Sequence, residues 1–384
     1  MSLSIIMFCP QFRPVVGGAE RQTEKLAVAL VAAGCGVTIL TPRVDMASPA
    51  REEHAGVSIV RFPLTDLSRH IPLPGIAALN IPYMLWQIVR TLHPLLNGAS
   101  ALHCHIGSLQ SAGAMLAGRR RGIPTLCKAA IAGNRSDLGE VERSGVSGRL
   151  VSWLLRRTTD TWIAITDAVK ESLVEAGIDI RDIALIPNGV TISSPATFRQ
   201  VGETARRFLY LGRLSTNINR DIRTLIQAFE RLHARHGDCE LAIVGGGDLL
   251  DEMRGFALQS GARRSIHLPG FDDPEKWIEW CDCFVLPSRR EGLSNALLEA
   301  MSARRACIAN DIPANREVLA GGDAGVLVPV GDAERLFQEM LQMVTTSGFC
   351  VAMGARAVVR AQACYSIEAV AQQHIQLYQR LLKR

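Results

Sequence analysis

Short apolar runs alternate with amphipathic segments along the whole chain, and the second half repeats the pattern of the first. Residues 3–9 (LSIIMFC) and 101–106 (ALHCHI) each precede a glycine-containing turn and a segment whose apolar positions recur every three or four residues. The pattern restarts at residues 207–211 (RFLYL) and continues through 283–288 (CFVLPS). Short runs that are apolar throughout, separated by amphipathic helices, indicate parallel sheets with crossover helices. We therefore predict an α/β protein with two Rossmann-like, doubly wound domains.

A polar segment at residues 191–203 (TISSPATFRQVGE) interrupts the alternation and predicts a domain boundary. We expect an N-terminal domain over residues 1–195, a second domain over 196–364, and a C-terminal helix over 365–384 that packs back on the first. Ligands of doubly wound sheets bind at the carboxyl ends of the strands, and helix N-termini there attract anions. The two domains are therefore expected to face each other across a cleft that suits an anion such as a pyrophosphate.

The net charge of +5 is concentrated in the N-terminal half. Residues 1–200 hold 20 Lys and Arg against 15 Asp and Glu, whereas residues 201–384 hold 22 of each. The longest uncharged stretch, residues 71–89, lies in the same half, but its prolines favour a loop and a surface helix over a membrane span. This combination suits an anionic membrane or a phosphorylated lipid, and equally a solvated basic surface. The low aromatic content, 5%, disfavours single-stranded nucleic acid as a partner.

The N-terminus and the cysteines bear on location. Residues 1–10 lack the basic region and cleavage site of a signal peptide and are interpreted as leading into the first strand. The ten cysteines show no disulfide or zinc-ribbon spacing and are typical of core thiols in a reducing compartment. We expect a cytoplasmic protein that can associate peripherally with the inner face of the membrane.

The segment 291–302, EGLSNALLEAMS, combines a glycine loop with the start of a helix. The N–H groups of residues 292–295 can cradle phosphate or sugar oxygens. Asn295 and Glu299 fall on one helical face, four residues apart, whereas Leu297 and Leu298 fall on another. Glu299 is placed to accept hydrogen bonds from two ribose hydroxyls. A surface glutamate beside an arginine is the alternative.

This segment resembles the signature of the retaining, nucleotide-sugar-dependent glycosyltransferases of the GT-B fold, in family four (glycosyl transferases group 1). Further segments resemble motifs of that family and occur in the same order, and the resemblance covers nearly the whole chain. They are VVGGAERQTEKLAVAL (15–30), ALHCHIG (101–107), IPNGV (186–190), YLGRL (210–214), RTLIQAF (223–229), LAIVGGGDL (241–249), IHLPGF (266–271) and GVLVPVGD (325–332).

The resemblance implies residue roles. Glu291 contacts the donor sugar, Glu299 binds the ribose, and Arg213 binds the phosphates. Arg220 stands where the family has a lysine, in a segment two residues longer than usual, and it can hold phosphate in a bidentate manner. Catalytic roles are implied for His105, Glu291 and Arg213, and donor contacts for Gly17, Gly18, Arg213, Arg220, Gly292, Leu293, Ser294, Asn295 and Glu299.

Two histidines share one face of the strand that carries ALHCHIG. His105 matches the cleft histidine of the family, whereas His103 is interpreted as a core residue. A metal site at this pair lacks a third ligand nearby. The segment 126–140 (LCKAAIAGNRSDLGE) offers weaker acceptor candidates, Lys128, Asn134 and Asp137, with an ordinary surface loop as the alternative.

No Asp-x-Asp occurs in the chain, although closely spaced carboxylates commonly hold Mg²⁺ or Mn²⁺ against a nucleotide sugar. We expect arginines and helix N-termini to meet the pyrophosphate charge instead, with no metal and no cofactor. The resemblance implies a front-face mechanism in which the leaving phosphate helps to deprotonate the acceptor. A nucleophilic role for Glu291 is the alternative.

The sequence therefore predicts a retaining hexosyltransferase. Its donor is a nucleoside-diphosphate sugar, of uridine or guanosine, and its acceptor is a hydroxyl of a glycan or a lipid-linked molecule in cell-surface polysaccharide or glycoconjugate biosynthesis. A nucleotide-sugar-binding protein without transferase activity is one alternative. A dinucleotide-dependent oxidoreductase is another, but the first turn, QFRPVVGGAE, lacks the G-x-G-x-x-G fingerprint.

Overall fold

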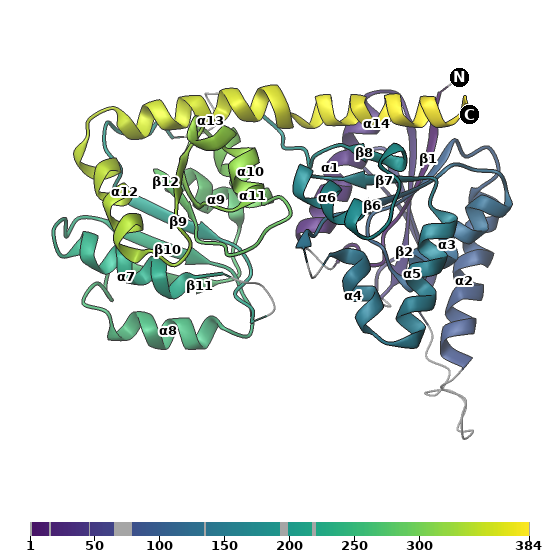
Figure 1. Ribbon diagram of the computed structural model, residues 1–384, viewed down its shortest axis with the longest axis horizontal. Helices are drawn as coiled ribbons and strands as arrows, with labels where there is room; N and C mark the ends of the chain where they lie inside the picture. Colours follow the sequence, from purple (N-terminus) through teal and green to yellow (C-terminus); the bar gives the residue numbers. More distant parts are fainter. Residues whose placement is uncertain are drawn as a thin grey trace. The chain divides into compact units, whose positions relative to one another are not determined.

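The computed structural model describes residues 2–14, 17–45, 47–64, 79–133, 136–192, 199–216 and 220–383. The chain forms two compact units, each with its own sheet (Figure 1). Unit 1 comprises Met1–Gly189 and Ile367–Arg384, and unit 2 comprises Val190–Ser366. The two α/β sheets confirm the predicted fold class.

The sheet of unit 1 has eight strands in the order β3-β4-β2-β1-β5-β6-β7-β8. The strands are β1 (Ser4–Phe8), β2 (Gly36–Arg43), β3 (Arg51–His54), β4 (Val57–Pro63), β5 (Ala101–Cys104), β6 (Thr125–Ala129), β7 (Thr161–Ala164) and β8 (Ile183–Leu185). All neighbouring pairs are parallel except β3 and β4, which form an antiparallel hairpin at the edge. This antiparallel edge departs from the parallel pairing that the sequence pattern predicts for the rest of the sheet. The polar strand β3 (REEH) lacks the apolar run on which that prediction relied.

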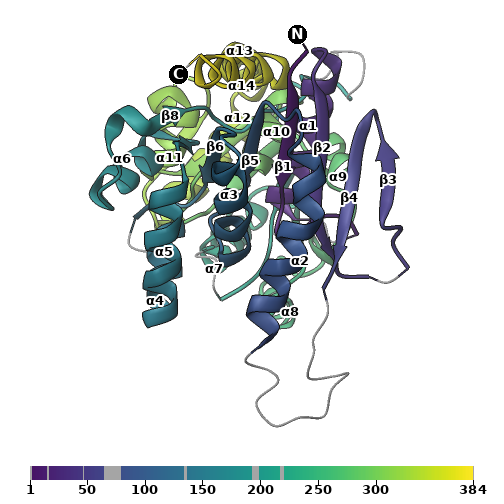
Figure 2. The ribbon, with the colours of Figure 1, turned by 90° about the vertical axis from the view of Figure 1, so that its right-hand side faces the viewer.

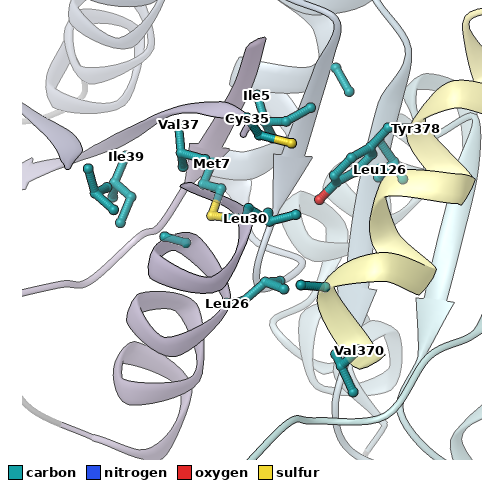
Figure 3. Packing of buried hydrophobic residues seen from close by; sticks show 14 of the residues in the cluster. Ile5, Met7, Leu26, Leu30, Cys35, Val37, Ile39, Leu126, Val370 and Tyr378 are labelled. Carbon is teal, nitrogen blue, oxygen red and sulfur yellow. The ribbon is translucent and has the colours of Figure 1, made fainter. Parts of the chain in front are cut away.

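Helices cover both faces of the unit 1 sheet. They are α1 (Gly18–Ala32), α2 (Asn80–Leu95), α3 (Leu109–Arg120), α4 (Asp137–Arg143), α5 (Val146–Thr158), α6 (Asp167–Glu175), η4 (Ile180–Asp182) and α14 (Ile367–Leu381). On one face, α14 packs against α1, and Val370 and Tyr378 join Ile5 of β1 and Leu30 of α1 in one apolar core (Figure 3). On the other face, α2, α3 and α5 run side by side (Figure 2).

The hairpin of α4 and α5 is an element that the sequence pattern did not predict. Ser136 caps α4 by accepting a hydrogen bond from the Gly139 N–H at 3.3 Å. Gly145 turns the chain at φ +87°, a conformation that favours glycine. A Cβ on Gly148 would lie 1.9 Å from the carbonyl oxygen of Val141, so the two helices approach closely at a glycine. The expected polar loop after β6 is therefore partly helical.

The sheet of unit 2 has six parallel strands in the order β11-β10-β9-β12-β13-β14. They are β9 (Arg207–Leu211), β10 (Glu240–Val244), β11 (Ile266–Gly270), β12 (Cys283–Leu286), β13 (Ala306–Asn310) and β14 (Val326–Val328). The helices are α7 (Ile222–His233), α8 (Leu250–Gln259), α9 (Pro274–Trp280), α10 (Asn295–Ser302), α11 (Pro313–Val318), η5 (Ala320–Gly322), α12 (Ala333–Thr345) and α13 (Phe349–Tyr365).

Helix α7 illustrates how the sequence builds this layer. Its buried apolar residues, Ile222, Leu225, Ile226 and Phe229, recur at helical spacing and face the sheet. Asp221 caps the helix, because its side chain accepts a hydrogen bond from the Thr224 N–H at 3.3 Å. The predicted elements around residues 207–233 and 283–302 are confirmed, and they bring the loops after β9 and β12 to the same edge of the sheet.

Candidate functional site

The loops after β9 and β12 are joined by backbone pairing at the edge of the unit 2 sheet. The Asp221 N–H donates to the Pro287 carbonyl at 2.7 Å, and Arg220 and Ser288 form an isolated antiparallel bridge. This pairing brings Arg220 beside Glu291, which lies 71 residues later in the chain.

Arg220, Ser288 and Glu291 form a nearly buried polar triad. The Arg220 Nη1 group donates hydrogen bonds to the Glu291 carboxylate and to the Ser288 hydroxyl. Ser288 Oγ in turn donates to Glu291 Oε1 at 2.9 Å. The side chains of Arg220 and Glu291 are 13% and 11% exposed. Burial lowers the pKa of the Arg220 guanidinium, and the neighbouring Tyr210 opposes this effect. Glu291 is therefore held as the counter-ion of Arg220.

Arg213 lies in the loop after β9, whose backbone is shaped by the glycines that follow β10. The Leu214 N–H donates to the Gly246 carbonyl at 2.9 Å. Gly245 and Gly247 have φ values of +147° and +144°. A Cβ at either position would lie 1.9 Å from a carbonyl oxygen, that of Gly212 for Gly245 and that of Leu214 for Gly247. Only glycine fits there, and the close contact sets the path of the backbone around the exposed Arg213.

Hydrogen bonds fix the rest of this loop. The Thr216 hydroxyl and N–H donate to Asp248 Oδ2 at 2.7 and 3.2 Å. A hydrogen bond from the Ser215 hydroxyl, followed by these two from Thr216, lowers the pKa of Asp248 to about 2. A cavity of about 110 Å³ opens beside the loop, lined by residues 214–215, 220–223, 249 and 252–253. Arg220 thus borders the cavity on one side and contacts Glu291 on the other.

Helix α10 begins directly after the loop that holds Glu291. Ser294 caps it by accepting a hydrogen bond from the Leu297 N–H at 3.4 Å. Leu297 is fully buried, whereas Asn295 and Glu299 are half-buried, one helical turn apart. The other predicted donor residues, Gly292 (half-buried) and Leu293 (buried), form the turn between Glu291 and the cap. The helix thus separates an apolar face from a polar one, as its spacing predicted.

In unit 1, the predicted histidine belongs to a buried aromatic stack. The rings of His103 and His105 stack at 4.3 Å, and His374 of α14 stacks on His103 at 5.5 Å. The Tyr378 hydroxyl lies 2.9 Å from His103 Nδ1. The Nε2 atoms of the three histidines are buried without a hydrogen-bond partner. Burial lowers the pKa of all three imidazoles, so they are neutral near pH 7.

A buried lysine accompanies the histidines. Lys128, at the end of β6, is 6% exposed and donates a hydrogen bond to Asn188 Oδ1 at 2.6 Å. Burial lowers its pKa to about 8. Within the described ranges, no carboxylate pairs with it, and no three His, Cys, Asp or Glu side chains come together as a metal site.

The remaining predicted residues have local roles. The Asp137 carboxylate accepts hydrogen bonds from the Ala130 and Ile131 N–H groups at 2.6 and 3.0 Å, so it anchors the turn after β6. Asn134 lies outside the described residues. Gly17 precedes α1 with an extended backbone at φ −127°. A Cβ on Gly17 would lie 2.4 Å from Glu20 Oε2, a buried carboxylate that the sequence analysis missed. Gly18 is the first residue of α1.

Comparison with known proteins assigns the family. Residues 205–346 match the family described as glycosyl transferases group 1, and residues 17–189 match the glycosyl transferase 4-like domain. The chain is a group 1 glycosyltransferase. Members of this family use a nucleotide sugar as donor, retain the anomeric configuration and need no metal ion, and the resemblance found in the sequence is confirmed.

Curated relatives of this glycosyltransferase include phosphatidyl-myo-inositol mannosyltransferases. The protein from Mycolicibacterium smegmatis is 33% identical over 56% of each chain. The protein from Mycobacterium leprae is 28% identical over 98% of this chain and 96% of the relative. A Campylobacter jejuni diphospho-undecaprenol 4-alpha-N-acetylgalactosaminyltransferase is 32% identical over 40% of this chain and 42% of the relative.

Solved structures show the same fold. Sucrose-phosphate synthase from Thermosynechococcus elongatus superposes with a TM-score of 0.75 at 19% identity and 99% coverage of both chains. Anabaena HepE in complex with UDP-glucose superposes with a TM-score of 0.74 at 16% identity, over 97% of this chain and 98% of that chain. This group 1 glycosyltransferase therefore has the GT-B fold.

Proposed function

We propose that this glycosyltransferase moves a hexose from a UDP- or GDP-sugar to a hydroxyl of a lipid-linked or glycan acceptor in cell-surface glycoconjugate biosynthesis. The triad of Arg220, Ser288 and Glu291 carries the proposal, because it places a fixed cation and a fixed carboxylate beside the loop of Arg213. Several relatives act on lipid-borne acceptors by name: phosphatidyl-myo-inositol, diphospho-undecaprenol and lipopolysaccharide. A cytoplasmic location at the membrane fits such acceptors.

In this proposal unit 2 binds the donor and unit 1 serves the acceptor. Arg213 and Arg220 face the diphosphate, whose negative charge grows as the bond to the anomeric carbon breaks. Glu299 receives the ribose hydroxyls, and the backbone N–H groups of residues 292–295 receive phosphate or sugar oxygens. In unit 1, Gly17, Gly18 and His105 stay candidates for donor contacts, and Lys128, Asn134 and Asp137 stay candidates on the acceptor side.

The chemical step is a front-face displacement. The bond between the anomeric carbon and the phosphate oxygen breaks, and its electron pair stays with the nucleoside diphosphate. The acceptor oxygen bonds to the anomeric carbon on the same face, and its proton passes to the departing phosphate. The ion pair with Arg220 supports a role for Glu291 in orienting sugar hydroxyls, because a carboxylate whose charge is neutralised by a guanidinium is a poor nucleophile.

The test measures release of nucleoside diphosphate from a panel of UDP- and GDP-sugars, together with the thermal shift that each donor produces. We expect one donor to raise Tm and to be slowly hydrolysed without acceptor, with activity that survives EDTA.

Arg213→Ala and Glu291→Ala should each lower turnover about 10²- to 10³-fold while the protein stays folded. Arg264→Ala, at an exposed arginine of unit 2, is the matched control. A donor that binds without any turnover, with or without acceptor, would support a binding protein instead, and strict Mn²⁺ dependence would contradict the site.

A further inference from the structure

Helix α5 exposes apolar side chains along one stripe. Val146, Leu150 and Trp153 recur at helical spacing and are 85%, 63% and 52% exposed. The opposite side of the helix buries Ser152 and Leu155 against the unit. Apart from Leu155, the buried residues of α5 are small or polar, namely Gly148, Ser152 and Thr158, so the helix exposes a larger apolar stripe than it buries. An exposed apolar stripe of this kind marks a surface for an apolar partner outside the unit.

Helix α2 shows the same feature. Trp86 is 50% exposed, and Leu79 and Val89 are exposed on the same side of the helix. Ile81 is 53% exposed, but it lies seven residues before the buried Ile88 and so belongs to the inner side, at the N-terminal end of the helix. Tyr83 stacks on Trp86 with ring centroids 5.6 Å apart, which holds the indole in place. The inner side of α2 buries Ile88 and Leu92.

The two stripes belong to one layer of helices. Both α2 and α5 pack against α3, one on each side of it, and Figure 2 shows the three helices side by side on one face of the sheet. We name the exposed side of α2 and α5 the tryptophan face. Its apolar members are Leu79, Trp86, Val89, Val146, Leu150 and Trp153, and its basic members are Arg90, Arg149 and Arg157.

The charge around the tryptophan face is positive. Residues 67–136 contain no Asp or Glu. Arg90 lies over the Trp86 ring at 5.1 Å, and Arg157 lies over the Trp153 ring at 5.5 Å. The nearby carboxylates are already paired: Glu140 with Arg143 at 2.6 Å and Glu142 with Arg156 at 2.8 Å.

We propose that the tryptophan face docks on the surface of an anionic lipid bilayer; this rests on the proposed function in that it explains how a lipid-linked acceptor is reached. Tryptophan prefers the membrane–water interface, and arginines beside it attract anionic headgroups. A helix of this composition lies in the plane of the interface. Within the described part of the chain, no helix is long and apolar enough to cross a bilayer. A second copy of the chain is disfavoured as the occupant, because a symmetric pair of these faces would bring arginines together.

The experiment is co-sedimentation of the purified full chain with vesicles of phosphatidylcholine, with and without phosphatidylglycerol. We expect binding to the anionic vesicles only, weakened by salt, with a blue shift of tryptophan fluorescence. Trp86→Ser/Trp153→Ser and, separately, Arg90→Gln/Arg157→Gln should each lower the partition coefficient about tenfold or more. Leu258→Ser, at a position of α8 that is 68% exposed, is the matched control and should leave binding unchanged.

The outcomes separate this proposal from the proposed function. Equal binding to neutral vesicles, binding that survives the double tryptophan change, or a tryptophan-dependent dimer in sedimentation velocity would overturn it. Vesicle binding requires no donor, and donor hydrolysis without acceptor requires no vesicle. The tryptophan variants should therefore keep the wild-type rate of nucleoside diphosphate release, which also shows that they are folded.

Discussion

At the scale of single residues, the decisive feature is Arg220, which pairs with Glu291 in a nearly buried position. A single guanidinium nitrogen, Nη1, holds both the Glu291 carboxylate and the Ser288 hydroxyl. The planar fork of an arginine has a second terminal nitrogen for a further contact, which the single nitrogen of a lysine does not offer.

Removing the charge of Arg220 alone should lower the free energy of unfolding more than removing both charges of the ion pair. Arg220→Gln leaves Glu291 nearly buried without its counter-ion, which costs about 3–5 kcal/mol of unfolding free energy. In Arg220→Gln/Glu291→Gln both charges are gone, and part of that loss should be recovered. Urea denaturation of the wild type, both single variants and the double variant measures the coupling. Additive losses in this cycle would show that the pair makes no specific contribution to the fold.

At the scale of elements, the glycines after β10 shape the loop of Arg213. Gly247→Ala places a methyl group 1.9 Å from the Leu214 carbonyl position, so the backbone of residues 212–216 must move. We expect Gly247→Ala to abolish the thermal shift produced by the donor and to lower Tm. Gly255→Ala is the matched control, because its added Cβ would meet no atom within 4 Å and alanine favours the helix by about 0.5–1 kcal/mol. If Gly247→Ala binds donor as the wild type does, the loop is not set by this contact.

Helix α14 supports the histidine stack of unit 1 with the ring of His374 and with the hydrogen bond between Tyr378 and His103. Tyr378→Phe leaves His103 Nδ1 buried and unpaired, which should lower the unfolding free energy by about 1–3 kcal/mol. Because His103 stacks on His105, we also expect kcat to fall more than the affinity for the donor. Steady-state kinetics beside urea denaturation distinguish this result from a purely structural effect, in which kcat would be unchanged once the protein is folded. Leu382→Ala, at an exposed residue just after α14, serves as the control.

At the scale of the whole molecule, the buried histidines predict sensitivity to acid. The pKa of His374 falls from 6.5 to about 4 in the folded chain, because burial and the nearby Lys128 disfavour its charged form. Between these values the unfolded chain binds the proton and the folded chain does not, so stability falls as pH drops below 6.5. A full shift of this size corresponds to about 3 kcal/mol, and His103 and His105 act in the same direction. Urea denaturation at pH 7 and pH 5 should show a lower free energy of unfolding at pH 5. In His374→Leu, the slope of the unfolding free energy against pH should be smaller than in the wild type. An unchanged slope would mean that His374 does not titrate on unfolding.

Much of the fold could be predicted from the sequence because its causes are local. Apolar runs such as residues 207–211, and the start of a helix at Asn295 after a Ser cap, depend on spacing within a few residues. The polar strand β3 escaped prediction because it carries no apolar run. The hairpin of α4 and α5 escaped it because α4 is mostly polar and glycines stand at 139, 145 and 148, although α5 carries apolar residues at helical spacing. The motif order also pointed to the family that the comparisons confirm.

By itself the sequence determined the α/β class, the positions of most strands and helices, and candidate site residues such as Glu291 and Arg213. Only the tertiary structure decided which of these groups touch. The ion pair of Arg220 with Glu291 depends on β9 and β12 being neighbours, and the contact of Tyr378 with His103 joins residues 275 positions apart. Periodicity and capping are set by neighbouring residues along the chain, whereas the partner of a buried polar group is set by sheet order and burial, which local sequence does not encode.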